Sequence, residues 1–308
     1  MRSIVGPRSV AALIVVVAAY AAAPAVAQGS SYTTETFGDR PFSPFRPRRE
    51  GPPPPAIRLR VERSVALLGP LAPGLAELQN GSIRVPLSVG HAVVDLDTGT
   101  VREAGDVPAG PVGETEWVIG GPAERFRFRS EPGNPPVLAA ERRSKGPDGA
   151  WKRRWMLRVP GLSTVPLVIR DRVFVGTRDN RVLGLRAKNG HRLWSQDVGD
   201  RVLAPLSPWS AEIAVPSGAP RSVAGILVVP EDGKRVIVLD PFDGAKLATL
   251  EIPGADARAD GGAVAAPDGR IVLLVRGYAP EDVSLLVARA EAAPSTPAPL
   301  AQEIEQGD

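Results

Sequence analysis

The sequence predicts an all-β protein built from short antiparallel strands. Across residues 57–291 the apolar runs are short and are cut by Gly, Pro, Asn and Asp, and no long stretch has the periodicity of a helix. Residues 57–62 alternate apolar and charged side chains, as a half-buried strand does. Residues 172–199 contain three strands in succession, separated by turns at Asp179-Asn180 and Asn189-Gly190. Strands joined by such tight turns indicate an antiparallel meander.

The meander belongs to a loose internal repeat. Residues 93–99, 184–190 and 238–244 align as two apolar positions, a polar one, two variable ones, a turn residue and a glycine. These glycines are expected to have a structural role, because a hairpin with a positive φ at this position excludes most other residues. A period of about 40 to 55 residues is typical of the four-stranded blades of a β-propeller. The repeat glycines are Gly99, Gly190 and Gly244.

Dividing residues 57–291 by a period of about 47 gives five blades. The last candidate blade shows only three strand signals, at residues 263–266, 270–275 and 283–290. A ring of blades must close or leave open edges, so we expect the strand near residues 57–64 to complete the last blade. Residues 110–145 lack the repeat signature, which leaves four blades, or an open array, as alternatives.

One copy of the repeat resembles a known family. Residues 184–194 read Gly-Leu-Arg-Ala-Lys-Asn-Gly-His-Arg-Leu-Trp. This resembles the repeat of the PQQ-like (quinoprotein-type) β-propellers, typically Ala-Leu-Asp-x-x-Thr-Gly-x-x-x-Trp, and the chain is closest in character to the BamB-like, non-catalytic members. The resemblance implies that Trp194 packs between blades. Arg186 replaces the usual Asp, and only this copy ends in Trp at the expected place. The other blades must therefore pack against their neighbours through different contacts.

The two ends of the chain differ from its middle. Residues 1–27 combine two arginines, an apolar run and a small-x-small site before Gln28, which predicts a signal peptide; an uncleaved anchor is the alternative. Residues 28–55 are rich in Pro, Ser and Arg and are expected to form a disordered tether. The propeller is therefore assigned to residues 56–291 and a disordered tail to residues 292–308.

Charge and cysteine content exclude several classes of protein. The chain contains no cysteine, which removes disulfides, thiolate metal sites and the lipid-modified cysteine of a lipoprotein. Without the predicted signal peptide, 35 basic side chains face 34 acidic ones, and the two signs are interleaved. We therefore expect no nucleic-acid partner, and an exported, periplasmic or extracellular monomer without a stable membrane span.

No linear motif predicts catalysis. The two histidines, His91 and His191, have no second ligand at metal-binding spacing, and no nucleophile elbow, phosphate loop or dinucleotide fingerprint is present. The PQQ-dependent dehydrogenases hold their quinone against an adjacent-cysteine disulfide, and this chain has no cysteine. We expect no catalytic residues, no metal site and no cofactor.

The combined features favour a non-catalytic scaffold of the cell envelope that binds a protein partner or another envelope component. Exposed aromatic side chains on the longer connections are the candidate partner-binding residues, because aromatic residues dominate interface energetics. The alternative is a ligand-binding protein or enzyme whose site lies over the central channel, with a quinone-dependent dehydrogenase disfavoured. The sequence leaves open which face binds. The candidate residues are Trp151, Trp155, Trp209 and Tyr278.

Overall fold

The computed structural model describes residues 53–68, 71, 77–79, 81–87, 90–104, 118–120, 126–144, 149–215, 218–279 and 281–293. The expected signal peptide, nearly all of the expected tether and the tail from residue 294 onward lie outside these ranges. Every regular element within them is a β-strand. None of the described residues forms a helix long and apolar enough to cross a membrane.

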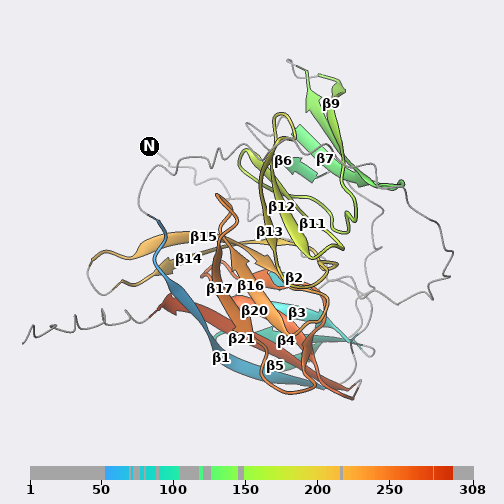
Figure 1. The fold of residues 1–308 in the computed structure, drawn as a ribbon. Coiled ribbons are helices and arrows are strands. Elements are labelled where there is room, and N and C mark those ends of the chain that lie inside the picture. Colours follow the sequence, from blue (N-terminus) through green and yellow to red (C-terminus); the bar gives the residue numbers. More distant parts are fainter. Residues whose placement is uncertain are drawn as a thin grey trace, which may run out of the picture.

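The strands form five antiparallel sheets, which are the blades of a β-propeller (Figure 1). Four of the blades contain consecutive strands in sequence order. Blade 1 is β2 (Glu77–Gln79), β3 (Ser82–Pro86), β4 (His91–Asp95) and β5 (Val101–Ala104), and blade 2 is β6 (Val118–Gly120), β7 (Phe126–Glu131), β8 (Val137–Arg143) and β9 (Trp151–Arg158). Blade 3 is β10 (Leu167–Ile169), β11 (Arg172–Gly176), β12 (Arg181–Arg186) and β13 (Arg192–Asp197), and blade 4 is β14 (Ser207–Ile213), β15 (Arg221–Val228), β16 (Arg235–Leu239) and β17 (Lys246–Glu251).

Blade 5 joins the two ends of the described chain. It contains the short strands β18 (Arg258–Ala259) and β19 (Val264–Ala265), then β20 (Ile271–Arg276) and β21 (Asp282–Ala292). Its outer strand is β1 (Ile57–Leu68), which pairs with β21 along its whole length, from Ile57 opposite Ala292 to Leu68 opposite Asp282. The predicted five blades, and the N-terminal strand that completes the last of them, are confirmed.

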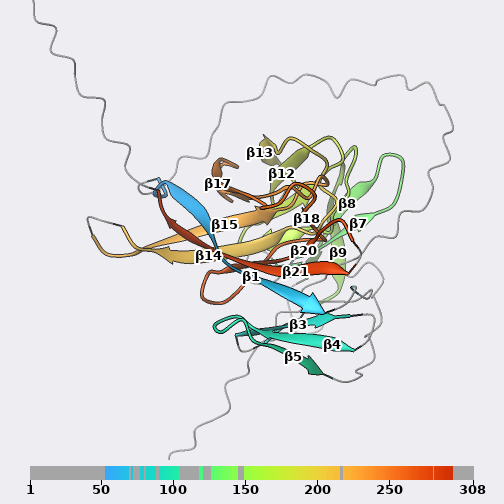
Figure 2. The same cartoon turned by 90° about the horizontal axis from the view of Figure 1, so that it is seen from below.

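Neighbouring blades are held together by apolar cores between their faces. Four such clusters join blade 2 to blade 3, blade 3 to blade 4, blade 4 to blade 5 and blade 5 to blade 1. Among the described residues no cluster joins blade 1 to blade 2, which lie at the lower and upper right of Figure 1 and are also separate in Figure 2. The described part of the array is therefore open between blades 1 and 2.

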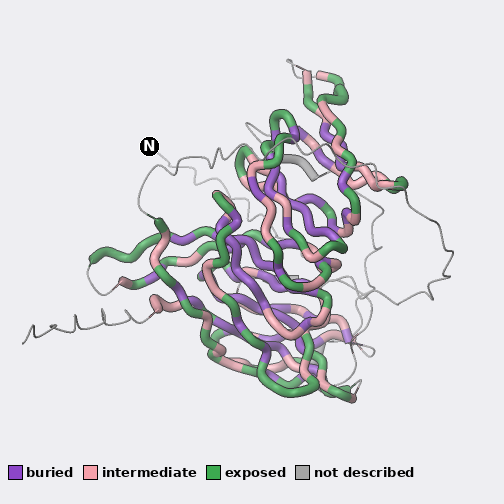
Figure 3. Tube along the Cα trace, in the orientation of Figure 1, coloured by how far each residue is buried: buried purple, intermediate pink, exposed green. Residues whose placement is uncertain are grey.

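Burial follows from the position of a blade in the array. The five residues from Ile271 to Val275 in blade 5 are all buried, because this strand is covered by blade 4 on one face and by blade 1 on the other. In strand β7 of blade 2, by contrast, Phe126 and Phe128 are buried, and the residues between and after them are partly exposed. Figure 3 shows buried segments through the middle of the blades and exposed hairpin tips. Within the described residues, one face of blade 2 therefore packs on blade 3 and the other is covered by no neighbouring blade.

Candidate binding surfaces

The three repeat turns share one backbone arrangement. Gly99, Gly190 and Gly244 all adopt positive φ, between 69° and 77°. Each donates its backbone N–H to the carbonyl oxygen four residues earlier, at 2.8 to 2.9 Å. In the first turn the Asp95 carboxylate also accepts hydrogen bonds from the backbone and hydroxyl of Thr98 and from the backbone of Asp97, which lowers the pKa of Asp95 below its usual value.

Each turn on blades 3 and 4 receives the tryptophan of the preceding blade. Trp155 on β9 donates its indole N–H to the Ala187 carbonyl at 2.9 Å, and a Cβ placed on Gly190 would lie 2.9 Å from its ring. Trp194 on β13 donates to the Pro241 carbonyl at 3.3 Å and covers Gly244 in the same way. The glycines are needed here for close approach as well as for the turn conformation.

Trp155 and Trp194 occupy equivalent places, although they lie at different distances from the preceding glycine. A β-bulge leaves Arg154 and Leu193 without a cross-strand partner, and each tryptophan directly follows that extra residue. The two tryptophans therefore share their place after the bulge and not their offset from the turn glycine.

The position after the bulge holds a tryptophan on β9 and β13 but not on β17, and a different residue makes the contact to the next blade there. On β17 the extra residue is Leu247, and the next residue is Ala248. Blade 5 has no hairpin turn for this position to cover, because its outer strand comes from the other end of the described chain. Instead Trp209, on the first strand of blade 4, donates its indole N–H to the Gly269 carbonyl of blade 5 at 2.8 Å.

Arginines hold blade 5 to blade 1. On β1 the extra residue is Glu62, and Arg63 follows it with its side chain against Gly99. Arg270, which is buried, donates to the Leu96 carbonyl at 2.6 Å and to the Asp97 carboxylate at 2.7 Å. The first repeat turn is thus covered by two guanidinium groups in place of an indole.

These contacts correct two of the predicted partner-binding residues. Trp209 is only 3 % exposed, in the core between blades 4 and 5. Trp155 packs in the core between blades 2 and 3, and its indole N–H is already bonded to blade 3. Trp209 is therefore not available to a partner in the folded protein, and Trp155, which is partly buried, joins blade 2 to blade 3. Tyr278 is largely exposed, and Trp151 is partly exposed on the side of blade 2 that no described blade covers.

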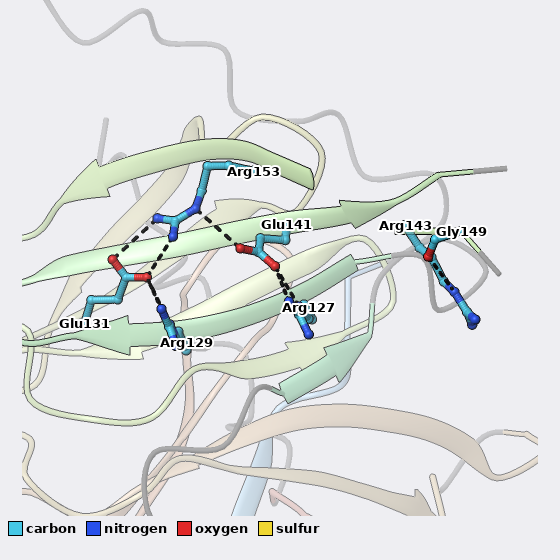
Figure 4. Close-up of polar contacts among 7 residues, drawn as sticks. All are labelled: Arg127, Arg129, Glu131, Glu141, Arg143, Gly149 and Arg153. Atoms are coloured by element: carbon cyan, nitrogen blue, oxygen red, sulfur yellow. Dashed lines mark hydrogen bonds and ion pairs between the residues drawn. The ribbon is translucent and has the colours of Figure 1, made fainter. Parts of the chain in front are cut away.

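The uncovered face of blade 2 carries an ion-pair network (Figure 4). Arg127 lies opposite Glu141, which lies opposite Arg153, on the three neighbouring strands β7, β8 and β9. The Glu141 carboxylate accepts the Nε–H of Arg127 at 2.8 Å and lies 3.6 Å from Arg153. Glu131 accepts from Arg129 at 2.9 Å and from Arg153 at 3.1 Å. Arg153 therefore links the two carboxylates.

The network sets the charge state of Glu131. Partial burial by itself raises the pKa of Glu131, but the hydrogen bonds and positive charges of Arg129 and Arg153 outweigh it and leave that pKa below the usual value. Glu131 is therefore a carboxylate at neutral pH. The paired charges keep this face polar where the inner blades have apolar faces.

We call the uncovered side of β7, β8 and β9 the outer face of blade 2. Trp151 lies on this face opposite Arg143, with the Arg127 guanidinium 4.7 Å above its ring. Met156, 57 % exposed, lies opposite Ala139. Five arginines against two glutamates give the face a formal excess of three positive charges. Its residues are Arg127, Arg129, Glu131, Val137, Ala139, Glu141, Arg143, Trp151, Arg153, Met156 and Arg158.

Tyr278 borders a shallow pocket between the ends of blades 4 and 5. Its side chain is 91 % exposed. The pocket has a volume of about 340 Å³ and is lined by apolar groups, by the Ser64 and Ser284 hydroxyls and by the Asp256 and Asp282 carboxylates. In the part of the chain that the structure describes, no set of three or more His, Asp or Glu side chains is arranged to hold a metal ion.

The family comparison matches the most regular part of the array. The family described as "Outer membrane protein assembly factor BamB", a PQQ-type repeat family, matches residues 148–289, which contain β9, blades 3 and 4 and the C-terminal strands of blade 5. These residues are PQQ-like propeller repeats. The predicted resemblance is thus confirmed. Blade 1, strand β1 and the strands β6–β8 lie outside the matched PQQ-like region.

The individual proteins to which this chain is similar match it only in part. A quinohemoprotein alcohol dehydrogenase, ADH IIB of Pseudomonas putida, is 40 % identical over 63 residues, which is 20 % of this chain and 8 % of that enzyme. Among solved structures, BamB from Moraxella catarrhalis has 12 % identity and a TM-score of 0.25, over 74 % of this chain and 99 % of that one. Myxococcus xanthus glutaminyl cyclase has 12 % identity and a TM-score of 0.35, over 78 % of this chain and all of that one.

Proposed function

We propose that the protein is an exported, non-catalytic propeller scaffold of the cell envelope that binds a protein partner through the outer face of blade 2. The observation that carries the proposal is the exposure of this face. The equivalent faces of the inner blades are covered by a neighbouring blade, whereas this one displays Trp151, Met156 and arginines on a rigid sheet. These residue types are enriched in protein interfaces.

The family match supports a binding role. The matched family is described as an outer membrane protein assembly factor, and this description supports an envelope location and a protein partner. The chain has no cysteine, so the lipid anchor of a lipoprotein is not part of this proposal. The apolar run at residues 10–23, with the arginines before it, supports export.

Capture from envelope extracts tests the proposal. The tagged wild-type protein is compared with a variant that carries Trp151→Ala and Met156→Ala, and co-purifying proteins are identified by mass spectrometry. A matched control is Val165→Ala, which shortens another exposed apolar side chain on the segment that leads into blade 3. We expect a discrete partner that the double variant loses and the control retains.

Two outcomes would contradict the proposal. Equal capture by the wild type and the double variant would place the binding surface elsewhere. Capture of no protein by the wild type, together with dehydrogenase activity on addition of quinone, would favour the enzyme alternative. The variants must first show the same unfolding midpoint as the wild type, so that a loss of capture is not a loss of folding.

A further inference from the structure

The outer strand of blade 2 differs from every other outer strand in its charge. Strand β9 contains Lys152, Arg153, Arg154 and Arg158 and no acidic residue. Each of the other outer strands of the array contains at least one acid: Glu62 on β1, Glu103 on β5, Asp197 on β13 and Glu251 on β17. The positive charge is therefore a property of this one edge and not of propeller edges in this protein generally.

Three of these cations have no counter-ion within the part of the chain that is described. Arg153 is held by Glu131 and Glu141, whereas Lys152, Arg154 and Arg158 are exposed and make no ion pair with a described residue. They lie on an edge, because among the described strands β9 pairs with β8 alone. The free side of an edge strand offers backbone N–H and C=O groups to an added strand.

The positive charges of β9 determine which charge an added strand must carry. A second copy of β9 would bring cations next to cations, and like charges directly opposite each other destabilise a strand pair. Opposite charges stabilise the pair, and alternate side chains of an added strand lie over one face of the sheet, here next to Trp151 and Met156.

Accordingly, we propose that the edge of β9 binds an extended acidic segment of the partner protein, which adds to blade 2 as a further strand. The inference rests on the proposed function and names the chemistry of the partner at that same site. Carboxylates of the segment pair with Lys152, on the opposite side of the sheet from Trp151, and with the bulge residue Arg154, and its apolar side chains contact Trp151 and Met156. Arg158 lies on the side of Trp151 and Met156 and adds positive charge to the same edge. An edge strand that no described strand pairs with fits an extended chain better than a lipid surface, which has no strand register.

Peptide binding tests both parts of the inference. The first probe is an eight-residue, end-capped, fluorescein-labelled peptide that alternates Glu with Val. A second peptide replaces each Glu with Gln, and a third keeps the charge but has Pro at two central Val positions, where a strand needs its N–H groups. Fluorescence anisotropy against the full-length protein should show binding of the first peptide and at least about tenfold weaker binding of the other two.

Charge reversal locates the site. The triple variant Lys152→Glu, Arg154→Glu and Arg158→Glu changes no ion pair with a described residue. We expect it to bind the Glu peptide at least about tenfold more weakly than the wild type does. Lys246→Glu, at an exposed basic residue of the outer strand β17, is the control and should bind as the wild type does. Urea unfolding establishes that both variants are folded.

Each other result contradicts the inference. Equal binding of the Glu and proline-containing peptides would show attraction by charge without strand addition. Sedimentation with vesicles of anionic phospholipid that the triple variant abolishes, with no peptide binding, would assign the edge to a membrane surface. If capture of an envelope partner persists in the triple variant but fails in Trp151→Ala/Met156→Ala, the proposed function stands and the acidic-strand inference fails.

Discussion

The side chain of Arg63 lies against the α-carbon of Gly99, in the place that an indole ring takes at the other two repeat turns. Both kinds of side chain directly follow a β-bulge on the outer strand of a blade, and both cover the turn glycine of the next blade. A guanidinium on an aliphatic stem can do this because it is flat at its end and apolar along its length. The contact between the last blade and the first is therefore built from a different residue on the same structural plan.

Removal of the Arg63 side chain should destabilise the protein. We expect Arg63→Ala to lower the free energy of unfolding by about 1 to 2 kcal/mol, because the stem packs on the Gly99 turn. Arg63→Trp should lower the free energy of unfolding less than Arg63→Ala does, because an indole ring at this position can pack on Gly99. Arg60→Ala, at a mostly exposed position, is the control and should change stability by less than about 0.5 kcal/mol. Urea unfolding measures all three; equal losses from Arg63→Ala and Arg60→Ala would contradict the packing role.

The close approach of Trp194 to Gly184 gives a second prediction. A Cβ at residue 184 would collide with the indole ring, so Gly184→Val should destabilise by more than about 2 kcal/mol through overpacking. Gly218→Ala is the matched control, because no heavy atom lies within 4 Å of the added group. Thermal unfolding followed by circular dichroism should separate the two variants. A Gly184→Val protein as stable as Gly218→Ala would mean that the indole does not occupy this position.

The two tryptophans of β9 should differ in their effect on stability. Trp155→Ala removes a partly buried ring packed between two blades and its hydrogen bond to Ala187, at a cost of about 3 kcal/mol. Trp151→Ala removes a partly exposed ring over which Arg127 lies, at a cost below about 1 kcal/mol. Urea midpoints of the two variants test this order. A larger loss at Trp151 would assign it a structural role.

The pKa of Glu131 predicts how the outer face of blade 2 responds to acid. A carboxyl group whose pKa is lowered by folding stabilises the protein fully above its unfolded value, near 4.5, and this contribution is lost as the pH falls through the folded value. The stability difference between the wild type and Glu131→Gln should therefore be constant from pH 7 to about 5.5 and should shrink below about pH 4.5. Its size should be less than about 1 kcal/mol, because the pair is partly exposed. A difference that grows on acidification would contradict the lowered pKa.

Deletion of residues 57–64 should remove the outer strand of blade 5 and destabilise the whole array. This segment pairs with β21 from Ala292 to Leu286 and contributes Ile57 to the core between blades 4 and 5. We expect a strongly lowered unfolding midpoint and a loss of cooperativity in calorimetry. An unchanged transition would show that closure of blade 5 by the N-terminal strand contributes little.

The sequence predicted the binding surface less well than the fold. The turn glycines and the alternating strands are local signals, so blade number and the role of residues 57–64 could be inferred from them. The roles of Trp155 and Trp209 could not, because an aromatic residue on an exposed connection and one that joins two blades have the same sequence pattern. The unusual charge of β9 was visible as a basic cluster, but only the pairing of β9 with β8 alone showed that it lies on a free edge.

By itself, the sequence determined the all-β class, the repeat and the positions of Gly99, Gly190 and Gly244, because a turn with positive φ restricts the residue locally. The tertiary structure decided which side chain covers each glycine. On the outer strands β9, β13, β17 and β1 a bulge selects the covering position, and that position holds Trp155, Trp194, Ala248 or Arg63 according to whether the next blade has a turn to cover. The contact depends on the register of two strands and on the neighbouring blade, and neither can be read from the local sequence.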